Sequence, residues 1–246
     1  MNVILYGFGA MGQKIYHQMK NQGDSIQAVV SLDFPMDIQE TKLNSLENYH
    51  EKADVLIDFS HPNNLNDILD YAKRTKTRLV LATTGYSQAQ LDLIGEASDE
   101  VAIFQSYNTS FGISMLVKIL KGVTKEIYDA DFDIEILEKH HHRKIDAPSG
   151  TAKLLYQVME EELPELEPVY DRSSLHQKRE HQEVGIQAIR GGTIFGEHSI
   201  YFAGLDEIIE IKHTALSRDV FATGAIQAAK TLMTKDKGLY SLKNIY

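Results

Sequence analysis

The first hundred residues alternate short apolar runs with stretches of helical period. The runs are bounded by glycine, proline or small polar residues, which is typical of strands that a parallel sheet buries on both faces. Helical stretches between successive strands indicate βαβ units, so this region predicts a doubly wound parallel sheet within an α/β domain. Strands are expected at residues 3–6, 26–30, 55–59, 78–82 and 101–104, with helices beginning near Ala10, Pro62 and Ser87.

The second half of the chain follows a different pattern. An apolar-periodic helix is expected from Phe111 to about Tyr128, and residues 131–140 alternate apolar and polar side chains as a strand does. Between residues 184 and 215, three strand-like runs are separated by Gly-Gly and Gly-Leu-Asp turns. We therefore expect an α+β domain with a largely antiparallel or mixed sheet.

Two further segments set the expected domain boundaries. Residues 153–182 predict a helix followed by an acidic, proline-containing excursion at 160–174, which we interpret as a mobile surface loop. A last helix near residues 218–234 is expected to pack back on the N-terminal domain. The expected domains are residues 1–109 with 217–246, and residues 110–216.

Composition and charge narrow the class of protein. The 246 residues carry 25 Lys and Arg against 35 Asp and Glu, a net charge of −10, so the attraction that drives nucleic-acid binding is absent overall. Cysteine is absent, which excludes disulfides, thiolate nucleophiles and Cys-ligated metals. No stretch approaches ~20 apolar residues and the N-terminus does not resemble a signal peptide, so we expect a cytoplasmic protein without membrane or nucleic-acid partners.

Three glycines follow the first expected strand in the spacing GxGxxG. Gly7, Gly9 and Gly12 stand where a tight turn and a helix N-terminus let the backbone approach a pyrophosphate. Asp33 lies 21 residues past Gly12, where an acid can accept hydrogen bonds from the adenosine ribose. This context predicts a Rossmann-type domain that binds NADH or NADPH; the alternative is a glycine-rich turn in an unrelated α/β domain. Asp33 favours NADH, but Lys14 could reach a 2′-phosphate, so both coenzymes stay open.

Two later strand ends also carry small polar residues, at residues 58–60 and 83–85. In an open α/β sheet the ligand crevice lies outside the carboxyl ends of the strands, so these residues can line the nicotinamide half of the coenzyme site. Ordinary turns and helix caps use the same residue types, which is the alternative for either segment taken singly.

One polar segment, EKHHHRKIDAPSGT from Glu138 to Thr151, concentrates the residues suited to acid–base chemistry. Its histidines can donate protons. Its end predicts an anion site, because backbone N–H groups and hydroxyls at Ser149, Gly150 and Thr151 open a helix. Lys144 adds positive charge nearby. The segment therefore predicts an anion site next to proton donors.

The three adjacent histidines do not favour a metal site. If the strand continues through them, His140 and His142 face one side and His141 the other, so that all three cannot serve one purpose. No HxxxH or HExxH spacing occurs, and Lys144 would place a positive charge beside the ion. We therefore expect no metal. The remaining alternative from composition is a solvated basic strand end without chemistry.

The same segment resembles the signature of the dihydrodipicolinate reductase family, which reads E, any residue, HH, two residues, K, any residue, DAPSGTA. The resemblance extends in order through GFGAMG, DFSHP, ATTG, YNTSFGIS, RGGTIFGEH and SRDVFATGAIQAAK, and so covers essentially the whole chain. The chain departs from the family at Thr109, where relatives often have phenylalanine, and at Ala10 and Gln13, where many have arginine.

The resemblance implies a role for each matching residue. His140 matches the general acid that protonates the ring carbon beside the hydride-accepting carbon, and Lys144 matches a second catalytic cation. With Lys144, the positions that match the holders of the substrate carboxylates are His141, Gly150 and Thr151. The matching cofactor contacts are Gly7, Phe8, Gly9, Ala10, Met11, Gly12, Asp33, Ala82, Thr83, Thr84, Tyr107, Asn108, Thr109 and Ser110.

The implied reaction is hydride transfer from NADH or NADPH to a cyclic dicarboxylate in lysine and diaminopimelate biosynthesis, with protonation of the neighbouring carbon. The first domain would bind the dinucleotide, and the second would bind substrate and form the oligomer. A homotetramer is expected, since the family is commonly tetrameric and residues 186–189 and 208–211 present apolar strand faces. Two alternatives stay open: another dinucleotide-dependent oxidoreductase of the same two-domain plan, and a non-catalytic NADH-sensing module.

Overall fold

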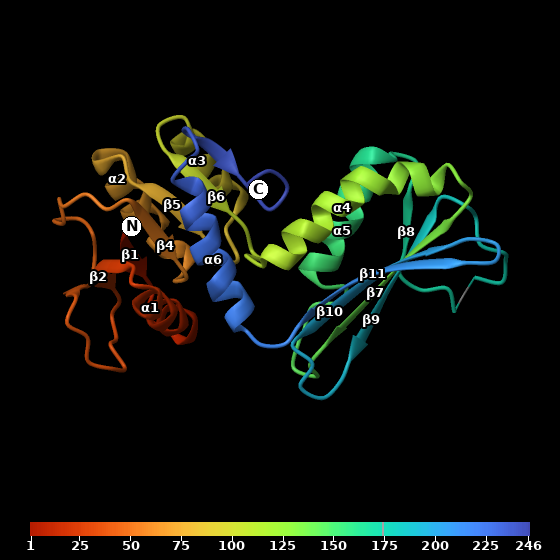
Figure 1. Ribbon diagram of the computed structural model, residues 1–246, viewed down its shortest axis with the longest axis horizontal. Helices are drawn as coiled ribbons and strands as arrows, with labels where there is room; N and C mark the ends of the chain where they lie inside the picture. The colour runs from red at the N-terminus through yellow and green to blue at the C-terminus, as the bar shows by residue number, and fades with distance from the viewer. Residues whose placement is uncertain (174) are drawn as a thin grey trace. The chain divides into compact units, whose positions relative to one another are not determined.

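The computed structural model describes residues 1–173 and 175–246 and divides the chain into two compact units (Figure 1). The first unit comprises Met1–Phe111 and Asp219–Tyr246, and the second comprises Gly112–Arg218. The chain therefore leaves the first unit once and returns to it at the end. Among the described residues, no helix is both long and apolar enough to cross a membrane.

Seven parallel strands form the sheet of the first unit, in the order β12-β6-β5-β4-β1-β2-β3. They are β1 (Asn2–Tyr6), β2 (Ser25–Val30), β3 (Thr41–Leu43), β4 (Val55–Asp58), β5 (Arg78–Leu81), β6 (Ala102–Gln105) and β12 (Gly238–Tyr240). The chain adds strands outward from β1 in both directions, which confirms the doubly wound parallel sheet that the sequence predicts. The sequence did not predict β3 and β12, because three-residue strands at the sheet edges show no period of hydrophobicity.

Helices connect these strands and cover the sheet. They are α1 (Ala10–Gln22), the 3-10 helix η1 (Pro62–Asn64), α2 (Leu65–Thr75), α3 (Gln88–Ser98) and α6 (Asp219–Leu232). Right-handed crossovers that run in opposite directions from the centre of the sheet place α1 on one face and α2 with α3 on the other. Helix α6 packs against α1, β5 and β6, so the last helix returns to the first unit as the sequence predicts.

The second unit is a mixed five-stranded sheet with two helices. The strand order is β11-β10-β7-β9-β8, in which β10 is antiparallel to both neighbours and the β7-β9-β8 pairings are parallel. The elements are α4 (Phe111–Tyr128), β7 (Asp133–His140), α5 (Gly150–Glu162), β8 (Glu167–Val169), β9 (Glu183–Arg190), β10 (Gly196–Ala203) and β11 (Ile208–Ala215). Helices α4 and α5 lie side by side, joined by an ion pair between Lys121 and Glu161 (Figure 1). The predicted α+β organisation with a mixed sheet is confirmed.

Strand β7 alternates between a buried and a half-buried face along its whole length. Its buried positions are Ile134, Ile136, Glu138 and His140. Because side chains alternate across a strand, the face that begins with two isoleucines ends with two polar residues. Helix α5 contacts this strand, so the last two buried positions lie where the sheet meets a helix.

The strand does not extend into the later histidines. It ends at His140, and the N–H of Lys144 donates to the carbonyl oxygen of His141 at 3.1 Å, so residues 141–144 form a turn. The idea that His140 and His142 share one strand face was therefore wrong. Backbone bonds to the Gly191-Gly192 turn after β9 hold this end of β7, a contact that local periodicity does not show.

The acidic excursion at residues 160–174 was predicted as a loop, which is wrong for part of its length. Residues 160–162 complete α5, and Glu167–Val169 form β8. Strand β8 pairs in parallel with β9, the next strand along the chain, and this pairing outweighs the loop-like composition. The end of the predicted loop, Ser174, lies outside the described residues.

Helix α6 lies so close to the segment before α4 that Gly224 admits no side chain. A Cβ atom there would lie 1.8 Å from the carbonyl oxygen of Thr109. We expect Gly224→Ala to lower the free energy of unfolding by about 1–3 kcal/mol, because the helix must move away from backbone atoms. Urea unfolding monitored by circular dichroism measures the change.

Gly122→Ala provides the matched control, because Gly122 is exposed in α4 and a Cβ there would meet nothing within 4 Å. This variant should gain about 0.5–1 kcal/mol, since alanine is the better helix former. Equal stability of the two variants would contradict the close packing at Gly224.

Candidate active site

The first glycine loop is closed by contacts that leave no room for side chains. Gly7 has a φ of 95°, and its N–H donates to the carbonyl oxygen of Val30 at 2.8 Å. A Cβ at Gly12 would lie 2.0 Å from the carbonyl oxygen of Gly7. Gly9 differs, because it caps α1 without a side-chain hydrogen bond and a Cβ there would meet nothing within 4 Å. Open space above a helix N-terminus fits the pyrophosphate of a dinucleotide.

A cavity of about 410 Å³ lies beside this loop in the first unit. It is lined by Gly9, Ala10, Met11, Phe59, Ser60, Ala82, Thr83, Thr84, Tyr107, Thr109 and Phe221. Most of these residues follow the carboxyl ends of β1, β4, β5 and β6, where open α/β sheets bind ligands. Most of the cofactor residues expected from the sequence therefore meet at one cavity.

The other expected cofactor residues do not line the cavity. Gly7 and Gly12 shape the glycine loop, and Phe8 is buried. The Asn108 side chain accepts a hydrogen bond from the N–H of Ser110 at 2.9 Å, which orders the segment beneath the cavity wall.

The ribose end of the expected coenzyme site is exposed. Asp33 follows β2 on the surface, and its N–H donates to the hydroxyl oxygen of Ser31 at 3.3 Å. The Lys14 ammonium, which the sequence allowed as a phosphate contact, pairs with the carboxylate of Asp219. The structure therefore directs Lys14 toward α6.

Phe221 is a cavity residue that the sequence analysis did not single out. It belongs to α6, and its carbonyl oxygen accepts a hydrogen bond from the Thr109 hydroxyl at 2.7 Å, across 112 residues of sequence. No local pattern could find this neighbour, because only the return of α6 to the first unit brings it to the site.

A buried carboxylate supports the wall of the cavity. Asp58 is 0% exposed and accepts hydrogen bonds from the Ser60 N–H at 3.0 Å and from the Tyr86 hydroxyl at 3.1 Å. Burial raises the pKa of Asp58, and these hydrogen bonds oppose that rise. The Ser60 N–H also donates to the Thr83 hydroxyl at 2.9 Å, so the network holds two lining residues from neighbouring strands.

A second group of polar residues lies inside the second unit, around Glu138. One carboxylate oxygen, Oε2, lies 2.6 Å from Nδ1 of His140 and 2.7 Å from Nη1 of Arg190. The other, Oε1, accepts from Nη2 of Arg190 at 2.6 Å and from the N–H of Ser149 at 2.9 Å. Glu138 is 0% exposed, and His140 is 9% exposed. One carboxylate thus joins β7, β9 and the start of α5.

Both the N–H and the hydroxyl of Ser149 form hydrogen bonds inside the second unit. Its hydroxyl caps α5 by accepting from the Ala152 N–H at 3.1 Å, and it lies 3.0 Å from Nε2 of His198. Burial lowers the pKa of His198 to about 3, so its imidazole is neutral at pH 7. The His198 ring also meets the His140 ring edge to face, with centroids 5.1 Å apart. His198 comes from β10, 49 residues from Ser149, so no local spacing predicts that it lies here.

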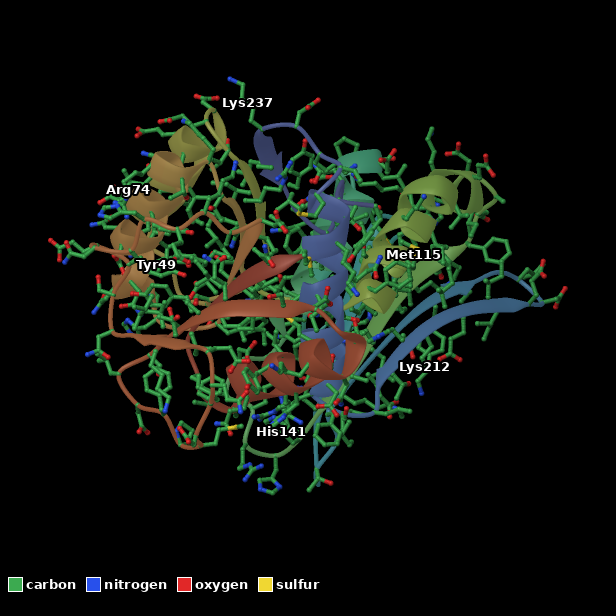
Figure 2. All side chains as sticks on the ribbon, turned by 60° about the vertical axis from the view of Figure 1, so that its left-hand side comes forward. Tyr49, Arg74, Met115, His141, Lys212 and Lys237 are labelled. Carbon is green, nitrogen blue, oxygen red and sulfur yellow. The ribbon has the colours of Figure 1, made fainter. Side chains whose placement is uncertain are left out.

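The loop after β7 carries the positive charge of the site. The Lys144 ammonium lies 2.7 Å from Asp146, and it lowers the pKa of that carboxyl although burial acts in the opposite direction. His141 lies on this loop (Figure 2), and its pKa is lowered by burial and then by the nearby positive charges of Arg143 and Arg218. Such a setting suits an anionic ligand.

The remaining residues of the motif differ in exposure. His142 and Arg143 are exposed, as is Gly150, while Thr151 is half-buried at the start of α5. In residues 1–173 and 175–246, no group of three or more His, Cys, Asp or Glu side chains could hold a metal ion.

Gly9→Ala tests whether the open space at the glycine loop receives the dinucleotide. Gly9 has φ −70° and ψ −163°, which alanine adopts without strain, so the free energy of unfolding should fall only by about 0.5–1 kcal/mol, because alanine is a poorer N-cap than glycine. The new methyl group would occupy the space above α1, and we expect NADH to bind about tenfold more weakly or worse. Calorimetric titration with NADH measures this; unchanged affinity would place the pyrophosphate elsewhere.

Two family models match the chain: dihydrodipicolinate reductase, N-terminus, over residues 1–109, and dihydrodipicolinate reductase, C-terminus, over residues 112–246. A 4-hydroxy-tetrahydrodipicolinate reductase of Exiguobacterium sibiricum is 48% identical, covering 100% of this chain and 96% of the relative. One of Clostridium tetani is 46% identical, covering 95% and 92%.

Solved structures agree with this result at the level of the fold. The dipicolinate-bound dihydrodipicolinate reductase of Paenisporosarcina sp. TG-14 has a TM-score of 0.84 at 23% identity, covering 100% of this chain and 99% of that one. An amine dehydrogenase of Mycobacterium smegmatis has a TM-score of 0.65 at 10% identity, covering 99% and 95%. With family models matched across both units and relatives of this identity, the chain belongs to the dihydrodipicolinate reductase family.

Proposed function

We propose that this chain reduces dihydrodipicolinate, formed by loss of water from 4-hydroxy-tetrahydrodipicolinate, to tetrahydrodipicolinate in lysine and diaminopimelate biosynthesis. Relatives named 4-hydroxy-tetrahydrodipicolinate reductase match the chain over nearly its whole length. The observation that carries the proposal is the buried pair of Glu138 and His140 beside the N-terminus of α5. The reaction needs a proton donor next to a holder for two carboxylates, and this arrangement offers both.

A nicotinamide coenzyme, NADH or NADPH, supplies the hydride when it is bound. The glycine loop fits its pyrophosphate, because a Cβ at Gly9 would meet no atom of the described residues within 4 Å. The nicotinamide half would lie in the cavity, which small residues line after β5, at segment 82–84, and after β6, at Thr109. Asp33, exposed after β2, would accept a hydrogen bond from the ribose.

We assign the proton transfer to His140. Glu138 binds Nδ1 of this ring, which leaves Nε2 as the nitrogen that can deliver a proton. Gly196 lies close to that atom, since a Cβ there would lie 3.1 Å from Nε2. One hydride to carbon and one proton to the neighbouring ring carbon together reduce the conjugated C=C–C=N system by two electrons.

The substrate carboxylates would be held by the N-terminus of α5 and by Lys144. The N–H and the hydroxyl of Ser149 already have partners inside the protein, so Ser149 shapes this anion site. We assign the direct contacts to Gly150 and Thr151, whose N–H groups open the helix. His141 and Lys144, on the positively charged loop, would complete the contact with the dianion.

His140→Gln and Lys144→Ala should fail in different ways. His140→Gln should lower kcat by about 10²- to 10⁴-fold, because general acid help is lost, while NADH and dipicolinate affinities stay within about twofold. Lys144→Ala should lower kcat and also weaken dipicolinate binding by about tenfold or more, because a charge-assisted contact is lost. NADH oxidation with freshly formed dihydrodipicolinate measures turnover, and calorimetry measures binding.

A different result would contradict each of these two proposed roles. Full turnover by His140→Gln would remove this residue from the mechanism. A defect of Lys144→Ala confined to NADH binding would move Lys144 to the coenzyme. Dipicolinate and NADH binding without any turnover by the wild-type chain would favour a sensing role.

We further propose that the chain assembles as a homotetramer through the sheet of the second unit. Strand β11 is an edge strand of that sheet, and Ile208 and Ile209 on it are 67% and 39% exposed. An exposed apolar edge strand is a template for pairing with another copy. Ile208→Lys should therefore lower the mass measured by light scattering. Leu32→Lys, a 91% exposed position of the first unit, should leave the mass unchanged; a monomeric wild type would refute the assembly.

A further inference from the structure

The fold does not need a charge at position 138. Glu138 continues the buried face of β7 that begins with Ile134 and Ile136, where alternation favours an apolar side chain. A buried ion pair rarely adds stability over apolar side chains of similar volume, because both charges lose their hydration. The presence of a carboxylate at position 138 is therefore better explained by the side chains and the N–H group that it binds than by a gain in the stability of the fold.

Arg190 makes this carboxylate a fixed acceptor. The guanidinium binds both of its oxygens, through Nη1 at 2.7 Å and Nη2 at 2.6 Å. Burial alone raises the pKa of Glu138, but hydrogen bonds from His140, Arg190 and Ser149 lower it to about 2. Glu138 is therefore ionised at neutral pH and can only accept hydrogen bonds. The ring nitrogen that faces it must carry a hydrogen.

Arg190 also connects the carboxylate to the loop of the motif. Its Nη2 donates to the carbonyl oxygen of Asp146 at 2.5 Å, and Asp146 in turn pairs with the Lys144 ammonium. Arg190 ends β9, and the N–H of the next residue, Gly191, donates to the carbonyl oxygen of His140 at 2.9 Å. Hydrogen bonds from the end of β9 therefore hold both His140 and the loop that follows it.

We propose that Glu138, clamped by Arg190, is a positioning residue that keeps a hydrogen on Nδ1 of the His140 ring, so that Nε2 is the nitrogen that takes a proton from solvent and delivers it to the substrate. The same carboxylate holds the N–H of Ser149, so one group sets the places of the acid and of the helix N-terminus that grips the substrate. Neither Glu138 nor Arg190 contacts the substrate in this scheme. The inference rests on the proposed role of His140.

Glu138→Gln tests the clamp. Glutamine offers one acceptor oxygen and one amide group to the donors of His140, Arg190 and Ser149, so at least one donor loses its partner. We expect kcat to fall about 10- to 100-fold, because the ring is no longer held in one tautomer and orientation. KM for NADH should stay within about twofold, since the coenzyme site lies in the first unit.

Glu197→Gln is the matched control. Glu197 lies on β10, directly opposite Lys139, and forms ion pairs with Lys139 and Lys212. The variant removes an ion-paired carboxylate from the same sheet without touching His140. It should keep wild-type kcat. A loss equal to that of Glu138→Gln would mean that any charge deletion in this sheet has the same effect, and would overturn the proposal.

A double variant separates positioning from a general structural effect. If Glu138 acts through His140, adding Glu138→Gln to His140→Gln should lower the residual kcat by less than about twofold. A further loss as large as in the single Glu138→Gln variant would overturn the proposal. Full activity of His140→Gln would instead refute the role of His140 itself. Wild-type activity of Glu138→Gln beside an impaired His140→Gln would overturn only the clamp.

The ring tautomer gives a readout that does not depend on turnover. Nitrogen-15 spectra of histidine-labelled protein, with the His140 signals identified by their loss in His140→Gln, should show hydrogen on Nδ1 in the wild type. Glu138→Gln should lose this single state. Should that variant not fold, Glu138→Met with Arg190→Met removes both charges together and should fold with the same loss of kcat. Wild-type turnover or an unchanged tautomer in the variant would refute the clamp.

Discussion

The buried carboxylate of Glu138 is the interaction that ties together the polar groups inside the second unit. It satisfies donors from three elements at once: His140 at the end of β7, Arg190 at the end of β9, and Ser149 at the start of α5. A buried charge is tolerated only when its hydrogen-bonding capacity is filled, and here both oxygens are used twice. The same constraint therefore orders the proposed acid and the proposed carboxylate holder.

In the first unit, the proposed coenzyme site depends on a different constraint. The glycine loop has no side chains at Gly7, Gly9 and Gly12. At Gly7 and Gly12 backbone atoms approach so closely that a Cβ has no place, while at Gly9 the space stays empty above a helix N-terminus. The partial positive charge of a helix N-terminus would act on a ligand here, in place of the paired ionised groups of the second unit. The proposed binding of the coenzyme and the proposed transfer of the proton therefore rest on different physical interactions.

Periodicity along the chain predicted the elements that are long enough to express it. The doubly wound sheet, the α4 helix at Phe111–Tyr128 and the mixed sheet all follow from local alternation of apolar and polar residues. Strands β3, β8 and β12 have three residues each, too few for a period, and they exist because a neighbouring strand offers backbone partners. The prediction of a chemical role for the motif from Glu138 to Thr151 likewise rests on residue types and spacing that are local.

The sequence by itself therefore determined the class of fold, the glycine loop and the segment that carries the histidines. Only the tertiary structure decided which of those groups meet. Arg190 lies 52 residues from Glu138, and His198 lies 49 residues from Ser149, so no local pattern pairs them. Alternation predicts which face of β7 a side chain occupies, but the charge that meets Glu138 comes from a strand laid beside it by non-local pairing.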